Sequence, residues 1–303
     1  MLSAAMMSQL FNGLSTASIL LMMAIGLAVI FGLMRVINMA HGELMTAGAY
    51  MAYVSPKILL AIGGPALVPW SYALALPLAF IAGAALGWLI EWAVVRHLYG
   101  RVLETLLATW GISLVLQQVF RDVFGSNNVT VNTPQWLQGG LSVTANVQLP
   151  WVRLFILFLL GVSLLATWLF LYRSRLGMQI RSVMQNRSMS SCCGIATRRI
   201  DAITFAFGSG LAGLAGCGLA LLGPIGPSTG QHYIVDAFMV VVLGGVGQLA
   251  GAVCGAFAIG ELQSFFEYMT SATAAKVIIF TLIIVFLQLR PAGFFPSRSR
   301  VLD

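Results

Sequence analysis

The chain has 303 residues, of which 59% are hydrophobic and only 8% are charged, and its mean hydropathy is +0.93. Roughly 25% of the residues in a soluble protein are charged, so this composition excludes a soluble fold and predicts an integral membrane protein. The net charge is +7, from sixteen basic and nine acidic residues. The basic residues are two lysines and fourteen arginines, most of them in short gaps between apolar runs. Such a distribution is typical of membrane topology signals rather than of nucleic-acid binding.

The apolar runs are long enough for membrane-spanning helices rather than barrel strands. In chain order, we predict spans at residues 12–34, 36–54, 72–95, 105–120, 151–172, 202–222 and 274–289. The stretch 233–269 is also apolar, but a cluster of glycines interrupts it, which indicates a discontinuous helix or a re-entrant pair of helices. The predicted fold is an all-α polytopic membrane protein, a single transmembrane domain over residues 1–303. It has about seven to nine transmembrane helices, plus a re-entrant or broken helix near residues 233–269.

The distribution of basic residues predicts the orientation of these helices. Twelve of the sixteen face the cytoplasm if the N-terminus lies outside, the C-terminus lies in the cytoplasm and residues 233–269 make no net crossing. The twelve are Arg35, Arg96, Arg101, Arg173, Arg175, Arg181, Arg187, Arg198, Arg199, Arg290, Arg298 and Arg300, and the other four are Lys57, Arg121, Arg153 and Lys276. Residues 122–150 then form an external loop, either a cap or docking surface or a disordered connector, and residues 173–201 form the main cytoplasmic loop.

The cytoplasmic loop has an internal pattern that a topology signal does not explain. Residues 178–184 are typical of an amphipathic helix, and a short polar stretch follows until Gly194 ends it. We interpret this stretch as a surface for a cytoplasmic ATPase, with Gln185, Asn186, Arg187, Ser188 and Met189 as candidate coupling residues. The alternative is a plain amphipathic connector.

Polar residues inside the second predicted span are the candidates for a translocation path. Asn38, His41 and Glu43 are costly in a membrane and therefore indicate function. Asn38 and His41, three residues apart, are expected to share a helix face, with Glu43 off that face. The alternative is that Glu43 only pairs with Arg35 near the cytoplasmic boundary.

Small residues at helical spacing predict close helix packing. One set is Gly247, Gly251 and Gly255, which repeat every four residues, and another is Gly213 with Gly216. Both sets indicate helix packing first, and only secondarily the border of a pathway.

The sequence lacks a nucleotide-binding P-loop and a zinc-protease motif. Neither lysine belongs to a Gly-Lys-Ser/Thr motif, so an ATPase would be a separate chain that binds ATP and Mg²⁺. No HExxH motif occurs, and we expect no enzyme activity, metal site or cofactor in this chain.

Several motifs resemble permease subunits of branched-chain amino-acid ABC importers. They are Val36–Glu43 with Gly48–Tyr50, Glu104–Ile112, Gln185–Arg187, Val240–Gly251 and Arg290–Phe295. The resemblance covers nearly the whole chain, and within the family residues 109–112 and 185–187 are most similar to the first permease of the urea importer. Arg35 and residues 190–193 depart from the family pattern.

The resemblance implies an importer that works by alternating access in the bacterial inner membrane. Its partners would be a second homologous permease, two cytoplasmic ATPase subunits and a periplasmic solute-binding protein, and residues 185–194 would be the coupling helix. The expected solute is urea, and the alternative is a branched-chain amino acid. A stand-alone secondary transporter or channel is a further alternative, because broken helices and an intramembrane carboxylate also suit one.

Overall fold

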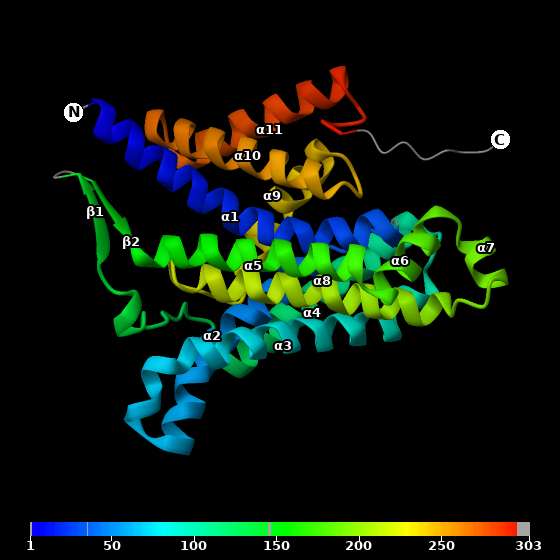
Figure 1. Cartoon of the computed structure of the whole chain (residues 1–303), viewed down its shortest axis with the longest axis horizontal. Helices are drawn as coiled ribbons and strands as arrows, with labels where there is room; N and C mark the ends of the chain where they lie inside the picture. The colour runs from blue at the N-terminus through cyan, green and yellow to red at the C-terminus, as the bar shows by residue number, and fades with distance from the viewer. Residues whose placement is uncertain (1, 35, 145–146, 296–303) are drawn as a thin grey trace.

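Helices account for most of the computed structural model, which describes residues 2–34, 36–144 and 147–295 (Figure 1). Among these described residues, eight segments are long and apolar enough to span a membrane. They correspond to α1 (Leu2–Met34), α2 (His41–Gly63), α3 (Ser71–Ala93), α4 (Val102–Phe124), α5 (Trp151–Arg173), α8 (Thr197–Leu219), α10 (Leu249–Met269) and α11 (Ala272–Leu289). The predicted all-α polytopic fold is therefore confirmed.

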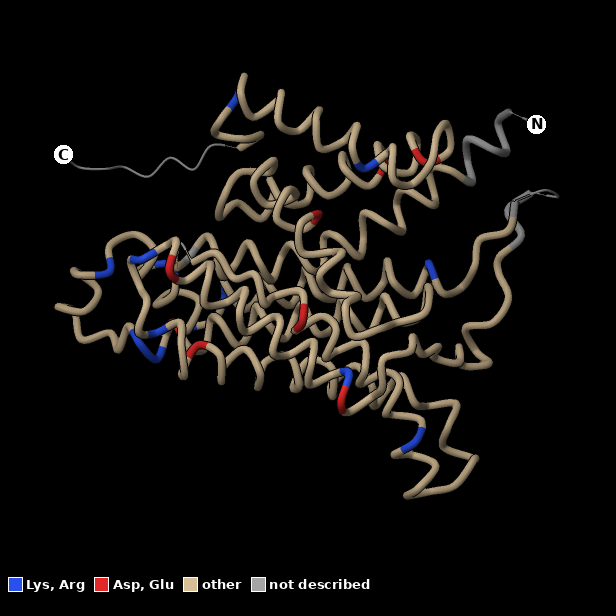
Figure 2. The backbone as a smooth tube through the Cα atoms, turned by 180° about the vertical axis from the view of Figure 1, so that it is seen from behind, with Lys and Arg blue, Asp and Glu red and all other residues tan. Residues whose placement is uncertain are grey.

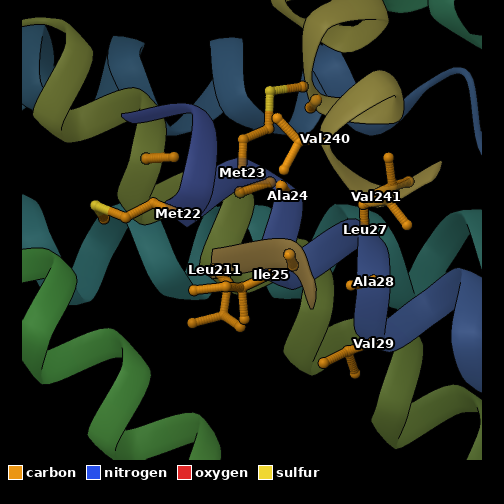
Figure 3. Packing of buried hydrophobic residues seen from close by; sticks show 14 of the residues in the cluster. Met22, Met23, Ala24, Ile25, Leu27, Ala28, Val29, Leu211, Val240 and Val241 are labelled. Atoms are coloured by element: carbon orange, nitrogen blue, oxygen red, sulfur yellow. The ribbon is translucent and has the colours of Figure 1, made fainter. Parts of the chain in front are cut away.

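Helix α1 forms the centre of the bundle. From Ala17 to Ile30 its side chains are buried on every face, as expected for a helix that is hydrophobic all round. Its Met22–Val29 segment lies near Leu211 of α8 and near Val240 and Val241 of the shorter helix α9 (Thr229–Gly244) (Figure 3). The remaining helices surround this core, so their outer faces carry most of the exposed apolar side chains.

Helix α8 packs closely against both α2 and α3 through glycines. A Cβ atom on Gly213 would overlap the Ala79 carbonyl oxygen of α3, and one on Gly216 would overlap the Met45 carbonyl oxygen of α2. The missing side chains let the backbones approach each other, which is how helices associate in lipid without a hydrophobic driving force.

The stretch 233–269 is a pair of helices rather than one broken helix. Helix α9 ends at Gly244, and α10 returns along it, with Gly251 against Gly244 and Gly255 against Val240. The turn between them needs positive φ at Gly245 (100°) and Gly247 (80°). Gly247 therefore precedes α10 and contacts Gly32 of α1, so the expected helical ladder of residues 247, 251 and 255 is wrong at its first member.

The second predicted span also differs from the structure. Its helix α2 begins at His41 rather than Val36 and continues to Gly63, beyond the expected end at residue 54. The 3₁₀ helix η1 (Pro65–Trp70) then leads into α3, and the 3₁₀ helix η2 (Val95–His97) follows α3.

The two ends of the bundle differ in structure and charge. At one end, residues 122–150 contain the 3₁₀ helix η3 (Gln135–Leu137) and a hairpin of β1 (Gly140–Thr144) and β2 (Val147–Pro150). The strands pair antiparallel with Leu141 opposite Leu149, so this loop is more ordered than a plain connector. The other end carries the short helices α6 (Arg175–Gln185) and α7 (Arg187–Cys192), and most Lys and Arg residues gather there (Figure 2).

Candidate translocation and coupling sites

The three polar residues predicted for the path are all buried near the start of α2. Asn38, His41 and Glu43 are 1%, 0% and 0% exposed, respectively. The chain approaches α2 through a non-helical turn, in which Asn38 Oδ1 accepts a hydrogen bond from the Ala40 amide at 3.0 Å. Asn38 therefore lies before the helix, and the expectation that it shares a helix face with His41 is wrong.

His41 and Glu43 contact different neighbours. His41 Nε2 lies 3.3 Å from the Met23 carbonyl oxygen, so its ring joins α2 to the central helix α1. Glu43 faces α4 instead, where its Oε1 accepts hydrogen bonds from Ser113 Oγ at 3.1 Å and Gln117 Nε2 at 2.9 Å. The two residues thus have separate surroundings, and Glu43 belongs to a polar cluster between α2 and α4.

The Glu43 carboxylate is only partly satisfied by this cluster. Its Oε2 is buried and has no hydrogen-bond partner among the described residues. Arg35, the partner in the alternative interpretation, lies outside the described residues. A buried carboxylate is costly in a membrane, and such groups are usually retained for a function. Glu43 is therefore the strongest candidate for direct contact with a solute.

The α4 residues of this cluster were not predicted from the sequence. Thr105, Thr109, Ser113 and Gln117 are buried at every fourth position of α4, whereas its opposite face is exposed and apolar. Residues four apart share one face of a helix, so this polar stripe was readable from the sequence. Gln117 Nε2 also lies 3.5 Å from Gln231 Oε1 of α9, a contact that no spacing rule indicates.

Thr109 fixes the turn that precedes α2. Its Oγ1 accepts a hydrogen bond from the Met39 amide at 3.1 Å and lies 3.4 Å from the Ile37 carbonyl oxygen. The Asn38 turn is therefore held by α4. The Asn38 Nδ2 amide, like Glu43 Oε2, is buried without a hydrogen-bond partner among the described residues.

The five predicted coupling residues lie at the α6–α7 junction. Gln185 ends α6, and Asn186 caps α7 by accepting a hydrogen bond from the Met189 amide at 3.0 Å. Ser188 and Met189 are exposed, and Met189 is 63% exposed although it is apolar. An exposed methionine beside polar residues is suited to a partner surface.

The Arg187 side chain turns back toward the bundle. Its Nη2 is 2.5 Å from Asp201 Oδ2 of α8, and its guanidinium lies 5.0 Å from the centre of the Tyr99 ring. The Tyr99 hydroxyl donates a hydrogen bond to Glu91 Oε1 of α3 at 2.8 Å. Burial, followed by the nearby Asp201 and Glu91 carboxylates, raises the pKa of Tyr99, so this hydroxyl stays protonated.

Residues 9–287 match the family described as "Branched-chain amino acid transport system / permease component". The chain belongs to this permease family. The permease BraD of a high-affinity branched-chain amino acid transport system from Pseudomonas aeruginosa is 31% identical, over 95% of this chain and 94% of that protein. The corresponding Escherichia coli protein, LivH, is 30% identical over the same shares of the two chains.

A permease with another named solute is also similar. The ribose import permease protein RbsC of Escherichia coli is 28% identical, over 92% of this permease and 84% of that protein. No solved structure matches. The family match and the eight apolar helices together show a multi-pass membrane permease, a component of a transport system.

Proposed function

We propose that this permease is the membrane subunit of an ABC importer and that it carries a branched-chain amino acid. The similar proteins of Pseudomonas aeruginosa and Escherichia coli are named for that transport, whereas the urea expectation receives no support from them. The observation that carries the proposal is the buried Glu43 carboxylate, which has one oxygen held by α4 and one without a partner among the described residues.

The polar cluster suits the two charged ends of an amino acid. The free carboxylate oxygen of Glu43 is an acceptor for the ammonium group, and the Asn38 amide is a donor for the carboxylate. Such contacts need not be tight, because a passage with too favourable a binding step does not release its solute. We expect the specificity to come mainly from an external binding protein.

Urea is the second candidate, favoured by the resemblance of residues 109–112 and 185–187 to urea-importer permeases. Urea is small, neutral and rich in N–H donors, and Glu43, Ser113 and Gln117 supply oxygen acceptors. Its carbonyl oxygen could also meet the Asn38 amide. The polar cluster can therefore bind either solute. The two solutes differ in charge, because the amino acid has two charged ends and urea is neutral.

Substitution of Glu43 separates the two solutes. In the reconstituted importer, Glu43→Gln keeps an acceptor oxygen but removes the charge that an ammonium group needs. We expect leucine uptake to fall about tenfold or more, because hydrogen bonds to charged groups contribute about 1.5–3 kcal/mol. Competition between labelled urea and leucine supplies the direct comparison. Strong urea uptake that leucine does not inhibit would reverse the order of the two candidates.

Purification tests the proposed partners. The importer would consist of this chain, a second homologous permease, two cytoplasmic ATPase subunits that bind ATP and Mg²⁺, and a periplasmic binding protein. The permease extracted in mild detergent should bring the ATPase chains with it. A chain that transports solute without any ATPase would instead be a stand-alone secondary transporter or channel.

A further inference from the structure

We infer that Arg187 is a positioning residue that latches α7 onto α3 and α8, rather than a residue that the permease presents to the ATPase. The inference rests on the proposed function, in which the α6–α7 junction meets a cytoplasmic ATPase. It assigns a role to Tyr99, Glu91 and Asp201, none of which the sequence analysis singled out.

Helix α7 cannot hold its own position. It has six residues, and a helix this short is unstable in water without tertiary contacts. Its side chains are exposed except for Ser190, whose hydroxyl lies 2.9 Å from that of Ser182 on α6. Within the described part of the chain, the polar side-chain interactions of α7 beyond α6 are those of Arg187 with Asp201 and Tyr99.

The Asp201 contact is asymmetric in a way that favours a latch. The Asp201 side chain is only 4% exposed, whereas that of Arg187 is 43% exposed. A buried carboxylate depends on its ionic partner, because removing that partner leaves an uncompensated charge. Asp201 therefore holds Arg187 against the bundle, and this constraint extends to α7.

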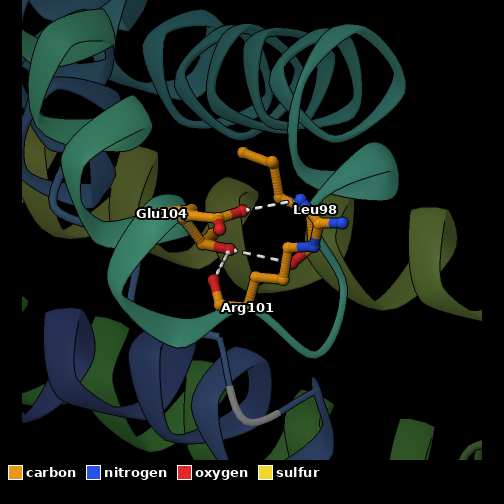
Figure 4. A network of polar contacts seen from close by, with 4 residues as sticks. Leu98, Arg101 and Glu104 are labelled. Atoms are coloured by element: carbon orange, nitrogen blue, oxygen red, sulfur yellow. Dashed lines mark hydrogen bonds and ion pairs between the residues drawn. The ribbon is translucent and has the colours of Figure 1, made fainter.

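The Tyr99 contact adds a second helix to the latch. Tyr99 lies in the turn between α3 and α4, and its hydroxyl donates to the buried Glu91 of α3. Thr105 Oγ1 closes this turn by donating hydrogen bonds to the Leu98 and Arg101 carbonyl oxygens at 3.1 and 2.7 Å. Leu98 and Arg101 are shown in Figure 4. The ring beneath Arg187 is thus held in place by both α3 and α4.

The latch connects α7 to the helices that position the polar cluster. Its two anchors are Asp201 on α8 and Tyr99, which Glu91 of α3 holds. Helices α3 and α8 pack against each other at Gly213, and α8 packs against α2 at Gly216. Helix α2 carries Glu43. A displacement of the exposed Met189 by the ATPase would therefore move α8 through Arg187 and Asp201. The movement of α8 would then displace α2. Packed interfaces of this kind shift between discrete arrangements rather than deform continuously.

The test measures solute uptake per ATP hydrolysed in proteoliposomes that contain the whole importer. We expect Arg187→Gln to lower this ratio about fivefold or more while the ATPase still co-purifies, because coupling energies between sites are commonly of that size. Asp201→Asn should have the same effect, and the double variant should be no worse than either single one. Arg199→Gln removes an equal charge from an exposed position in the first turn of α8 and should stay within about twofold of the wild type.

A second measurement uses the purified full-length permease without its partners. The melting-temperature losses of Arg187→Gln and Asp201→Asn should be strongly non-additive in detergent if the two side chains form one latch. Tyr99→Phe keeps the ring and should retain more coupling than Tyr99→Leu. Additive losses of melting temperature would contradict the latch. A second contradicting result would be that Arg187→Gln loses ATPase binding while the complexes that still form keep the wild-type ratio of solute uptake to ATP hydrolysed. If the wild type binds no ATPase, the proposed function fails, but the melting cycle still decides whether the latch exists.

Discussion

At the scale of single residues, the buried carboxylate of Glu43 organises the polar cluster between α2 and α4. Two neutral donors from α4, Ser113 and Gln117, hold one of its oxygens. His41, only two residues earlier, faces α1 instead and joins the helices. His41 and Glu43 are close in sequence but do not form one site, because each faces a different neighbouring helix.

The contribution of Gln117 can be measured against its own neighbour. Gln117→Leu removes one of the two donors to a buried carboxylate, so we expect a loss of about 1–3 kcal/mol in stability and a clear loss of uptake. Gln118→Leu makes the same chemical change on the exposed face of α4 and should be nearly neutral. Thermal melting in detergent and uptake assays test both variants. Equal effects would show that Gln117 has no special relation to Glu43.

At the scale of helices, close packing of α8 against α2 and α3 determines where the polar cluster lies. Gly216→Ala would press a methyl group onto the Met45 carbonyl, and overpacking of this kind costs about 1–3 kcal/mol. The matched control is Gly111→Ala on α4, where a Cβ would meet no atom within 4 Å. Because alanine favours helices over glycine by about 1 kcal/mol, this control should be neutral or slightly stabilising. Similar melting temperatures for the two variants would contradict the packing argument.

At the scale of the whole molecule, the two ends of the bundle carry different structures and different charge. The end with α6 and α7 carries most of the basic residues, and the β1–β2 hairpin lies at the other (Figures 1 and 2). An excess of Lys and Arg marks the cytoplasmic side, so we predict that α7 faces the cytoplasm and that residues 122–150 face outward.

Cysteine labelling tests this orientation with a residue that the chain already has. Cys192 at the end of α7 is exposed, and Ser126 is exposed at the opposite end. In a variant that keeps only Cys192, an impermeant thiol reagent should label inverted vesicles but not intact cells with a permeable outer membrane. Ser126→Cys in a cysteine-free chain should show the reverse. Labelling of Cys192 from outside would contradict both the orientation and the coupling surface.

The membrane environment, the helical fold, the break within residues 233–269 and the polar character of the α2 entrance all follow from the amino-acid sequence. These properties depend on local composition and on segment length, because an apolar helix needs about 20 residues to cross the hydrocarbon core of a membrane. The polar stripe of α4 was equally local, although it was not recognised.

The contacts between side chains of different helices, in contrast, depend on the tertiary structure. It delayed the start of α2 to His41, because Thr109 of α4 holds the preceding turn, and it placed Gly247 in a turn against α1. It also turned Arg187 toward Asp201 and Tyr99. In each case the partner comes from a segment distant in the chain, and the contact arises from helix packing that local spacing does not encode.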